Sequence, residues 1–160
     1  MSFPKEKLRP DDKALVLFCA AFGGAQDAIN FREVGLTDVT CLDADQGKLE
    51  AMMVVYPKPW LFICGDAFEE IDDRKPKSYD VVTCDQFSNH DTDIIKRVPK
   101  LLEIARRLVL ISWCADGPTS MKYLVTALIA AADGGWTIEL RLRSTHCGGC
   151  FWIVFEKAAK

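Results

Sequence analysis

Three aspartates stand directly after apolar runs, and their side chains are the first candidates for chemistry in this sequence. Asp43 ends the run DVTCLD, Asp66 follows WLFICG, and Asp85 ends YDVVTCD. Carboxylates bind hydroxyl groups, amines and positive charge, and a carboxylate can also act as a general base. A buried carboxylate without such a partner is costly. If the three lie together, they therefore indicate a polar or cationic ligand.

The glycine-rich stretch LFCAAFGGAQDAIN, residues 17–30, is the second candidate. Its small residues would let a ligand approach the backbone, and Gly23 and Gly24 fall between an apolar run and a helical pattern. Such a turn could cradle a nucleotide or hold a different cofactor. It could also serve only to let the chain turn with a positive φ. The glycines alone leave these alternatives open.

Short apolar runs alternate with helical patterns, and this order decides where the candidate side chains lie. The predicted strands are 14–18, 38–43, 60–66, 79–85, 108–113, 136–144 and 150–157. The predicted helices are 25–34, 46–55, 91–106 and 120–133, and the third strand is followed by a short turn, AFEEI, and a charged loop within 67–78. Five β-α units followed by a hairpin predict an α/β fold: a three-layer, doubly wound, mostly parallel seven-stranded sheet with a C-terminal antiparallel β-hairpin. Such sheets bind ligands where the parallel strands end. We expect the glycines and the three aspartates to meet there.

Length, composition and charge are those of one globular domain. The chain has 160 residues, 49% hydrophobic and 27% charged, with a net charge of −3, which excludes a globally basic surface for nucleic acid. We expect a single domain over 1–160 with an N-terminal extension at 1–12. No apolar run approaches the roughly 20 residues of a membrane span, and the polar N-terminus has no signal peptide. We therefore expect a cytoplasmic protein without membrane association.

Seven cysteines occur, and five of them lie in or beside apolar runs, where a thiol packs as a small buried hydrophobe. These five are Cys19, Cys41, Cys64, Cys84 and Cys114. An odd number in a cytoplasmic chain favours reduced thiols. His146, Cys147 and Cys150 supply only three of the four ligands of a structural zinc site, so a hairpin turn is favoured and no metal is predicted.

Taken together, these motifs resemble those of class I (Rossmann-like) S-adenosylmethionine-dependent methyltransferases. The family's acid-x-Gly-x-Gly-x-Gly motif resembles residues 19–25, where Ala21, Gly23 and Ala25 take the glycine places. Its second, third and fourth motifs resemble VTCLDADQGKLEAM, FICGDAFEEI and YDVVTCDQF, and the hairpin at 136–157 matches the family's ending. The likeness covers most of the chain and rests on element order plus four motifs.

The resemblance implies S-adenosylmethionine as cofactor and a role for each matching residue. The implied cofactor contacts are Cys19, Ala21, Gly23, Gly24, Asp43, Ala44, Asp66, Ala67 and Phe68. Among them Asp43 takes the ribose position, and Asp66 and Ala67 lie beside the adenine, on which Phe68 packs. Asp85 faces the reacting centre as the implied catalytic residue. The expected contacts to the methyl acceptor are Phe87, His90 and Trp113.

Two departures from the family keep other functions open. Cys19 stands where the family places an acid, and the fourth motif reads DQFS instead of the stretch typical of amino-methylating DNA enzymes. A non-catalytic cofactor-binding protein or partner subunit is therefore one alternative. An NAD-binding oxidoreductase is another, less favoured because a carboxylate edge repels a pyrophosphate.

The acceptor, a small molecule or a macromolecule, is not identified by the sequence. The extension and the segments 86–92 and 114–119 are expected to contact it, with a homo-oligomer or a partner subunit completing the pocket. Five basic residues on the fourth predicted helix and its end are interpreted as a solvated helix face. They are Lys96, Arg97, Lys100, Arg106 and Arg107.

Overall fold

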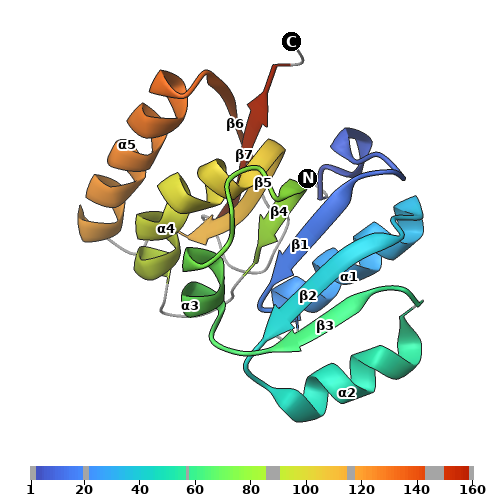
Figure 1. The fold of residues 1–160 in the computed structure, drawn as a ribbon. Helices are drawn as coiled ribbons and strands as arrows, with labels where there is room; N and C mark the ends of the chain where they lie inside the picture. The colour runs from blue at the N-terminus through green and yellow to red at the C-terminus, as the bar shows by residue number, and fades with distance from the viewer. Residues whose placement is uncertain are drawn as a thin grey trace.

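A computed structural model describes residues 3–19, 22–56, 58–85, 91–114, 118–142 and 150–158. Its elements follow the predicted order (Figure 1). The strands are β1 (Lys13–Leu17), β2 (Asp38–Asp43), β3 (Leu61–Cys64), β4 (Tyr79–Cys84), β5 (Ala105–Cys114), β6 (Trp136–Leu142) and β7 (Cys150–Lys157). The helices are η1 (Lys5–Lys7), α1 (Phe22–Val34), α2 (Gln46–Val55), α3 (Ala67–Asp72), α4 (Asp91–Ile104) and α5 (Pro118–Asp133).

The seven strands form one sheet in the order β3-β2-β1-β4-β5-β7-β6. Strands β1 to β5 are parallel, and β7 runs antiparallel to both β5 and β6. Strand order reverses between β1 and β4, the kind of switch point at which such sheets bind ligands. We call the edge where the parallel strands end the carboxyl edge, and the edge where they begin the amino edge. The predicted doubly wound sheet with a terminal hairpin is confirmed.

Side chains alternate along the strands and supply two cores, which makes the fold three-layered. Leu15 and Leu17 of β1 belong to the core beneath α3, α4 and α5. Ala14 and Val16 belong to the opposite core, with Phe31 of α1. Since both faces of the central strands are covered, continuous apolar runs are the pattern that these strands require.

Local signals fix several helix ends as the sequence predicts. Gly35 follows α1 with φ 88°, and its N–H and that of Leu36 donate to the carbonyls of Arg32 (3.0 Å) and Phe31 (3.1 Å). This double closure is a Schellman motif, which favours glycine at that position. Asp45 caps α2 by accepting a hydrogen bond from the Lys48 N–H at 3.0 Å.

Some of the predicted boundaries are wrong. The fourth helix ends at Ile104, with Pro99 inside it, and β5 begins at the next residue. Arg106 and Arg107 therefore lie in β5, at the amino edge, and are not part of a solvated helix face. The segment AFEEI, predicted as a short turn, is the beginning of helix α3.

The N-terminal extension packs on the face of the sheet that α1 also covers. The Phe3 ring meets Phe31 and Trp152 edge to face, with centroids 6.0 and 5.3 Å apart. Lys7 binds Glu156 at 2.6 Å, which ties η1 to β7. Residues 3–8 thus act as a cover for the sheet, a role that the sequence did not predict.

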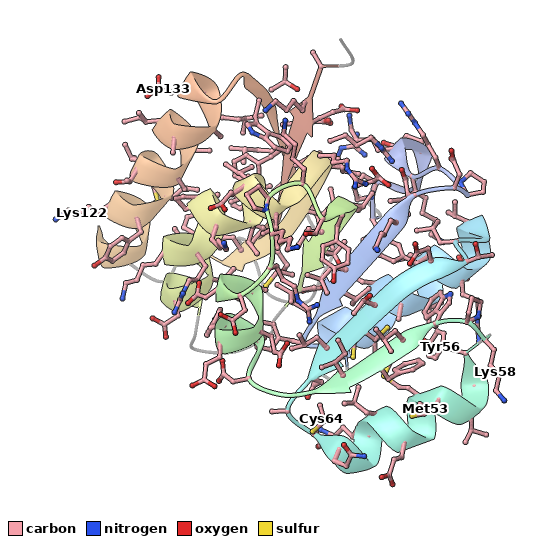
Figure 2. All side chains as sticks on the ribbon, in the orientation of Figure 1. Met53, Tyr56, Lys58, Cys64, Lys122 and Asp133 are labelled. Carbon is pink, nitrogen blue, oxygen red and sulfur yellow. The ribbon has the colours of Figure 1, made fainter. Side chains whose placement is uncertain are left out.

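The outer strand β3 departs from the buried pattern of the other parallel strands. Its four residues are exposed or half-buried, and Cys64 lies exposed at its end, next to α2 (Figure 2). The prediction that Cys64 is a buried thiol is therefore wrong, because an outer strand lacks one neighbour. Cys19, Cys41 and Cys84 are buried. Among the described helices, none has the length and apolar character needed to cross a membrane.

Candidate functional site

The chain leaves β1 through a turn that starts at a strained residue. Phe18 has φ 55°, which is unusual for an aromatic side chain. Its ring meets the Phe68 ring edge to face, with centroids 5.6 Å apart, and so joins the end of β1 to the start of α3. Strain of this kind gathers at functional sites. The sequence analysis missed Phe18 because no residue pattern reports a left-handed φ at a phenylalanine.

Cys19 turns its thiol into the core and not toward the carboxyl edge. It is fully buried, and its N–H donates to the Leu42 carbonyl at 3.3 Å. A hydrogen bond with Cys41, followed by burial and the charge of Asp43, raises the pKa of the Cys19 thiol far above its usual value. The side chain is therefore a neutral thiol, and it cannot take the role of the acid that the family places there.

Asp43 ends β2 with its carboxylate held by the chain itself. Its Oδ1 accepts the Asp45 N–H at 2.9 Å, and the residue is 8% exposed. Its carbonyl accepts the Gly65 N–H at 3.0 Å, which fixes the end of β3 beside the end of β2. Ala44 follows as an exposed residue. Asp43 and Asp66 are therefore brought to neighbouring positions, as expected.

Asp66 is the N-cap of α3. Its Oδ1 accepts the N–H groups of Phe68 (2.8 Å) and Glu69 (3.1 Å), so the carboxylate has a structural role whatever else it binds. Ala67 is buried and Phe68 is half-buried. The Arg97 guanidinium lies over the Phe68 ring at 5.4 Å from the centroid, so one face of this ring is already in contact.

Asp85 follows β4 and Trp113 lies near the end of β5, at the same edge, but both are deeply buried. Asp85 has no exposed surface and Trp113 is 4% exposed. The Trp113 Nε1 has no hydrogen-bond partner among the described residues. Trp113 also belongs to the core beneath α3 to α5. Both side chains therefore lie under the edge and not on its surface.

The remaining candidates divide into placed and unplaced residues. Gly23 and Gly24 lie in the first turn of α1, so this helix begins three residues earlier than predicted. Ala21, Phe87 and His90 lie outside the described residues, as do His146 and Cys147. Within the described ranges, no group of three or more potential metal ligands occurs.

Asp27 is a second residue that the sequence analysis missed. It is fully buried in the second turn of α1, and Asn30, one turn later, is 3% exposed. A carboxylate in a helix face that also buries Ala28 and Phe31 is costly unless it is compensated. The signal was present in AQDAIN, where two polar residues share the apolar face of the helix.

No protein-family model matches the chain, and no curated protein matches its sequence. Solved structures match its fold. Magnesium protoporphyrin IX methyltransferase from Synechocystis, with bound SAH, is 17% identical with a TM-score of 0.65, over 93% of this chain and 75% of that one. An S-adenosylmethionine-dependent methyltransferase from Mesorhizobium loti is 12% identical with a TM-score of 0.63, over 92% and 91%.

A third similar structure is described as a complex between the Haloferax volcanii Trm112 methyltransferase activator and "the putative methyltransferase". It is 12% identical with a TM-score of 0.67, over 96% of this chain and 85% of that one. Identities this low establish a shared fold. The chain has the Rossmann-like fold found in S-adenosylmethionine-dependent methyltransferases.

Proposed function

We propose that a chain with this fold binds S-adenosylmethionine at its carboxyl edge and transfers the methyl group to an acceptor. The observation that carries the proposal is the fixed pair of carboxylates at the ends of β2 and β3. Asp43 is held by the Asp45 N–H, and the Gly65 N–H ties the start of the Asp66 turn to the Asp43 carbonyl. Both lie on one side of the switch point, where this fold accepts a ligand.

The residues of this edge fit the proposed cofactor chemically. A ribose diol donates hydrogen bonds, which an ionised carboxylate such as Asp43 accepts strongly. The half-buried Phe68 offers an aromatic surface beside Ala67 for the adenine, on the ring face away from Arg97. We assign the methionine part to the turn around Cys19, Ala21, Gly23 and Gly24, and a ribose-side contact to Ala44.

When bound, S-adenosylmethionine would supply an electrophilic methyl group on a sulfonium. In-line displacement needs alignment of the two reactants more than a covalent intermediate, so the chain's contribution is to position them. Asp85 is the carboxylate we assign to accept a proton from the acceptor, where one must leave. Phe87, His90 and Trp113 are the side chains we assign to the acceptor.

A binding experiment tests the cofactor. S-adenosylhomocysteine should raise the melting temperature of the full chain, because a ligand that binds only the folded state stabilises it. Asp43→Ala should weaken this binding at least about tenfold, since hydrogen bonds to a charged group are lost. Asp38→Ala is the matched control, because Asp38 is exposed at the other end of the same strand. A chain that NAD stabilises but S-adenosylhomocysteine does not would overturn the proposal.

A second candidate function is cofactor binding without catalysis, as a partner subunit. The buried neutral thiol of Cys19 supports it, since no acid stands at that position. An exposed apolar surface on α2 and β3 supports it too: Met53, Val54, Val55 and Leu61 are each more than half exposed. Transfer of labelled methyl groups to fractions of small molecules, RNA, DNA or protein separates the two candidates. Binding without any transfer favours the partner subunit.

A further inference from the structure

A cavity of about 570 Å³ opens at the amino edge, opposite the proposed cofactor site. Charged side chains dominate its lining: Arg9, Lys77, Arg106, Arg107, Glu156 and Lys157. They come from the N-terminal segment, the loop before β4, the start of β5 and the end of β7. Five cations and one carboxylate thus meet in a protein whose net charge is −3.

Two of the cations are held by carboxylates and form a fixed wall. Arg107 binds Asp12 through two nitrogens and donates to the Lys7 carbonyl at 2.9 Å. Arg106 donates to Asp80 at 3.0 Å. Since Glu156 is itself bound to Lys7 at 2.6 Å, the only carboxylate named in the lining has a cation of its own.

The other three cations, Arg9, Lys77 and Lys157, have no carboxylate partner among the described residues. Arg9 and Lys77 are exposed, and Lys157 lies over the Trp136 ring at 5.2 Å from its centroid. The backbone places the first two: the Arg9 N–H donates to Asp12 at 2.7 Å, and the Lys77 N–H donates to the Glu103 carbonyl at 2.9 Å. Three like charges around one hollow repel each other until an anion enters.

We propose that this cavity binds a small phosphorylated molecule, with its phosphate or diphosphate group among Arg9, Lys77 and Lys157. Negatively charged phosphate oxygens pair with ammonium groups and accept two parallel N–H hydrogen bonds from a guanidinium. The volume lies within the range of small-molecule sites and exceeds the need of a diphosphate alone, so an organic part fits beside it. A nucleic-acid strand would instead need basic residues along an extended groove.

The position of the cavity separates it from methyl transfer. Arg106 and Arg107 lie in the first residues of β5, whereas Trp113 lies near its other end. The bound molecule would therefore act as an effector or a stabilising ligand and would not meet the cofactor. The inference is independent of the proposed function, because it rests on none of the residues at the carboxyl edge.

Isothermal titration calorimetry with inorganic pyrophosphate tests it on the full chain at low salt and near-neutral pH. The wild type should bind one equivalent, and Arg9→Gln and Lys77→Gln should each weaken binding about two- to fivefold. Lys75→Gln is the matched control, because Lys75 is exposed in the same loop and does not line the cavity. Asp80→Asn should strengthen binding by a similar factor, since it releases Arg106.

Three results would overturn the inference. One is the absence of saturable binding by the wild type. Another is an equal loss in Lys75→Gln and Lys77→Gln, which would indicate general screening of a basic surface. The third is binding of polyuridylate that is tighter than that of pyrophosphate and not displaced by it, which would assign this edge to nucleic acid. Because Arg9, Lys75 and Lys77 are exposed, their glutamine variants should fold, and an unchanged melting temperature without ligand confirms that they do. Asp80 is half-buried, so Asp80→Asn should melt slightly lower than the wild type and is titrated well below its melting temperature.

Discussion

The two edges of the sheet hold their charges by different means. At the carboxyl edge, Asp43 and Asp66 accept backbone N–H groups from residues no more than three positions away. At the amino edge, the bond between Arg107 and Asp12 joins residues 95 positions apart, and that between Arg106 and Asp80 joins residues 26 apart. The two carboxylates at one edge are held by local turns, whereas the ion pairs at the other form only once the sheet has assembled.

This difference predicts how substitutions at each edge affect ligand binding and the stability of the fold. A carboxylate held by its own turn is pre-organised, and removing it affects a ligand first and the fold second. A buried pair between distant segments is part of the fold, and removing one partner leaves an uncompensated charge. Substitutions at the two edges should therefore separate loss of binding from loss of stability.

The strongest test of the contrast is an acid in place of Cys19. The resemblance to methyltransferases would put an acid there, but this side chain is fully buried and lies near Asp43. Cys19→Asp should lower the free energy of unfolding by about 3–5 kcal/mol, because a charge is buried without a partner. Urea denaturation followed by circular dichroism measures the change.

Cys64→Asp is the matched control, since Cys64 is also a cysteine at the carboxyl edge, at the end of β3, but is exposed. Its effect should stay within about 0.5 kcal/mol. If Cys19→Asp is as stable as the wild type and binds S-adenosylhomocysteine more tightly, the side chain at position 19 faces the cofactor. The conclusion that it is buried in the core would then be wrong.

The next test breaks the amino edge at Asp12. This carboxylate is 4% exposed and binds both the Arg107 guanidinium and the Arg9 N–H. Asp12→Ala should cost about 3 kcal/mol, since Arg107 is left unpaired at 16% side-chain exposure. In a domain of this size the melting temperature should fall by about 6–12 °C, measured by differential scanning calorimetry.

Asp11→Ala is the control, because its side chain is exposed beside Asp12 and it should change the melting temperature little. If Asp12→Ala lowers the melting temperature as little as Asp11→Ala does, the buried ion pair contributes nothing to the stability of the fold. The contrast between the edges would then lose its energetic basis.

The carboxyl edge was largely predictable because its signals are local. Strands that are buried on both faces produce continuous apolar runs, so the end of each run marks the place where Asp43, Asp66 and Asp85 follow. The order of these runs then gave the sheet and its switch point. The burial of the Cys19 thiol was also predicted. What the sequence did not provide was the depth of Asp85 and Trp113, which lie under the edge, and only the packed structure shows this.

The amino edge was not predictable for the opposite reason. Its residues lie in segments that the fold alone brings together, and each one by itself resembles an ordinary solvated charge. The end of the fourth helix was also predicted too late. Arg106 and Arg107 were therefore assigned to α4, although β5 starts directly after this helix. No periodic pattern marks a strand that follows a helix without a loop.

The smallest expected effect is a pH dependence at Asp80. Burial opposes ionisation of this carboxylate, but the Lys13 N–H and the Arg106 guanidinium outweigh it, so its pKa lies below the ordinary value. A lowered pKa contributes stability above the unfolded pKa of about 4, and this contribution is lost as the pH falls through the folded value. The free energies of unfolding of wild type and Asp80→Asn should differ by about 0.5–1 kcal/mol from pH 7 to pH 5, and the difference should vanish in stronger acid.

Asp73→Asn, at an exposed aspartate after α3, should show no such trend in the same urea titrations. A stability difference between wild type and Asp80→Asn that stays constant into acid would mean that it comes from the geometry of the hydrogen bonds and not from the charge of Asp80. Arg106 would then already be available to an anion in the wild type.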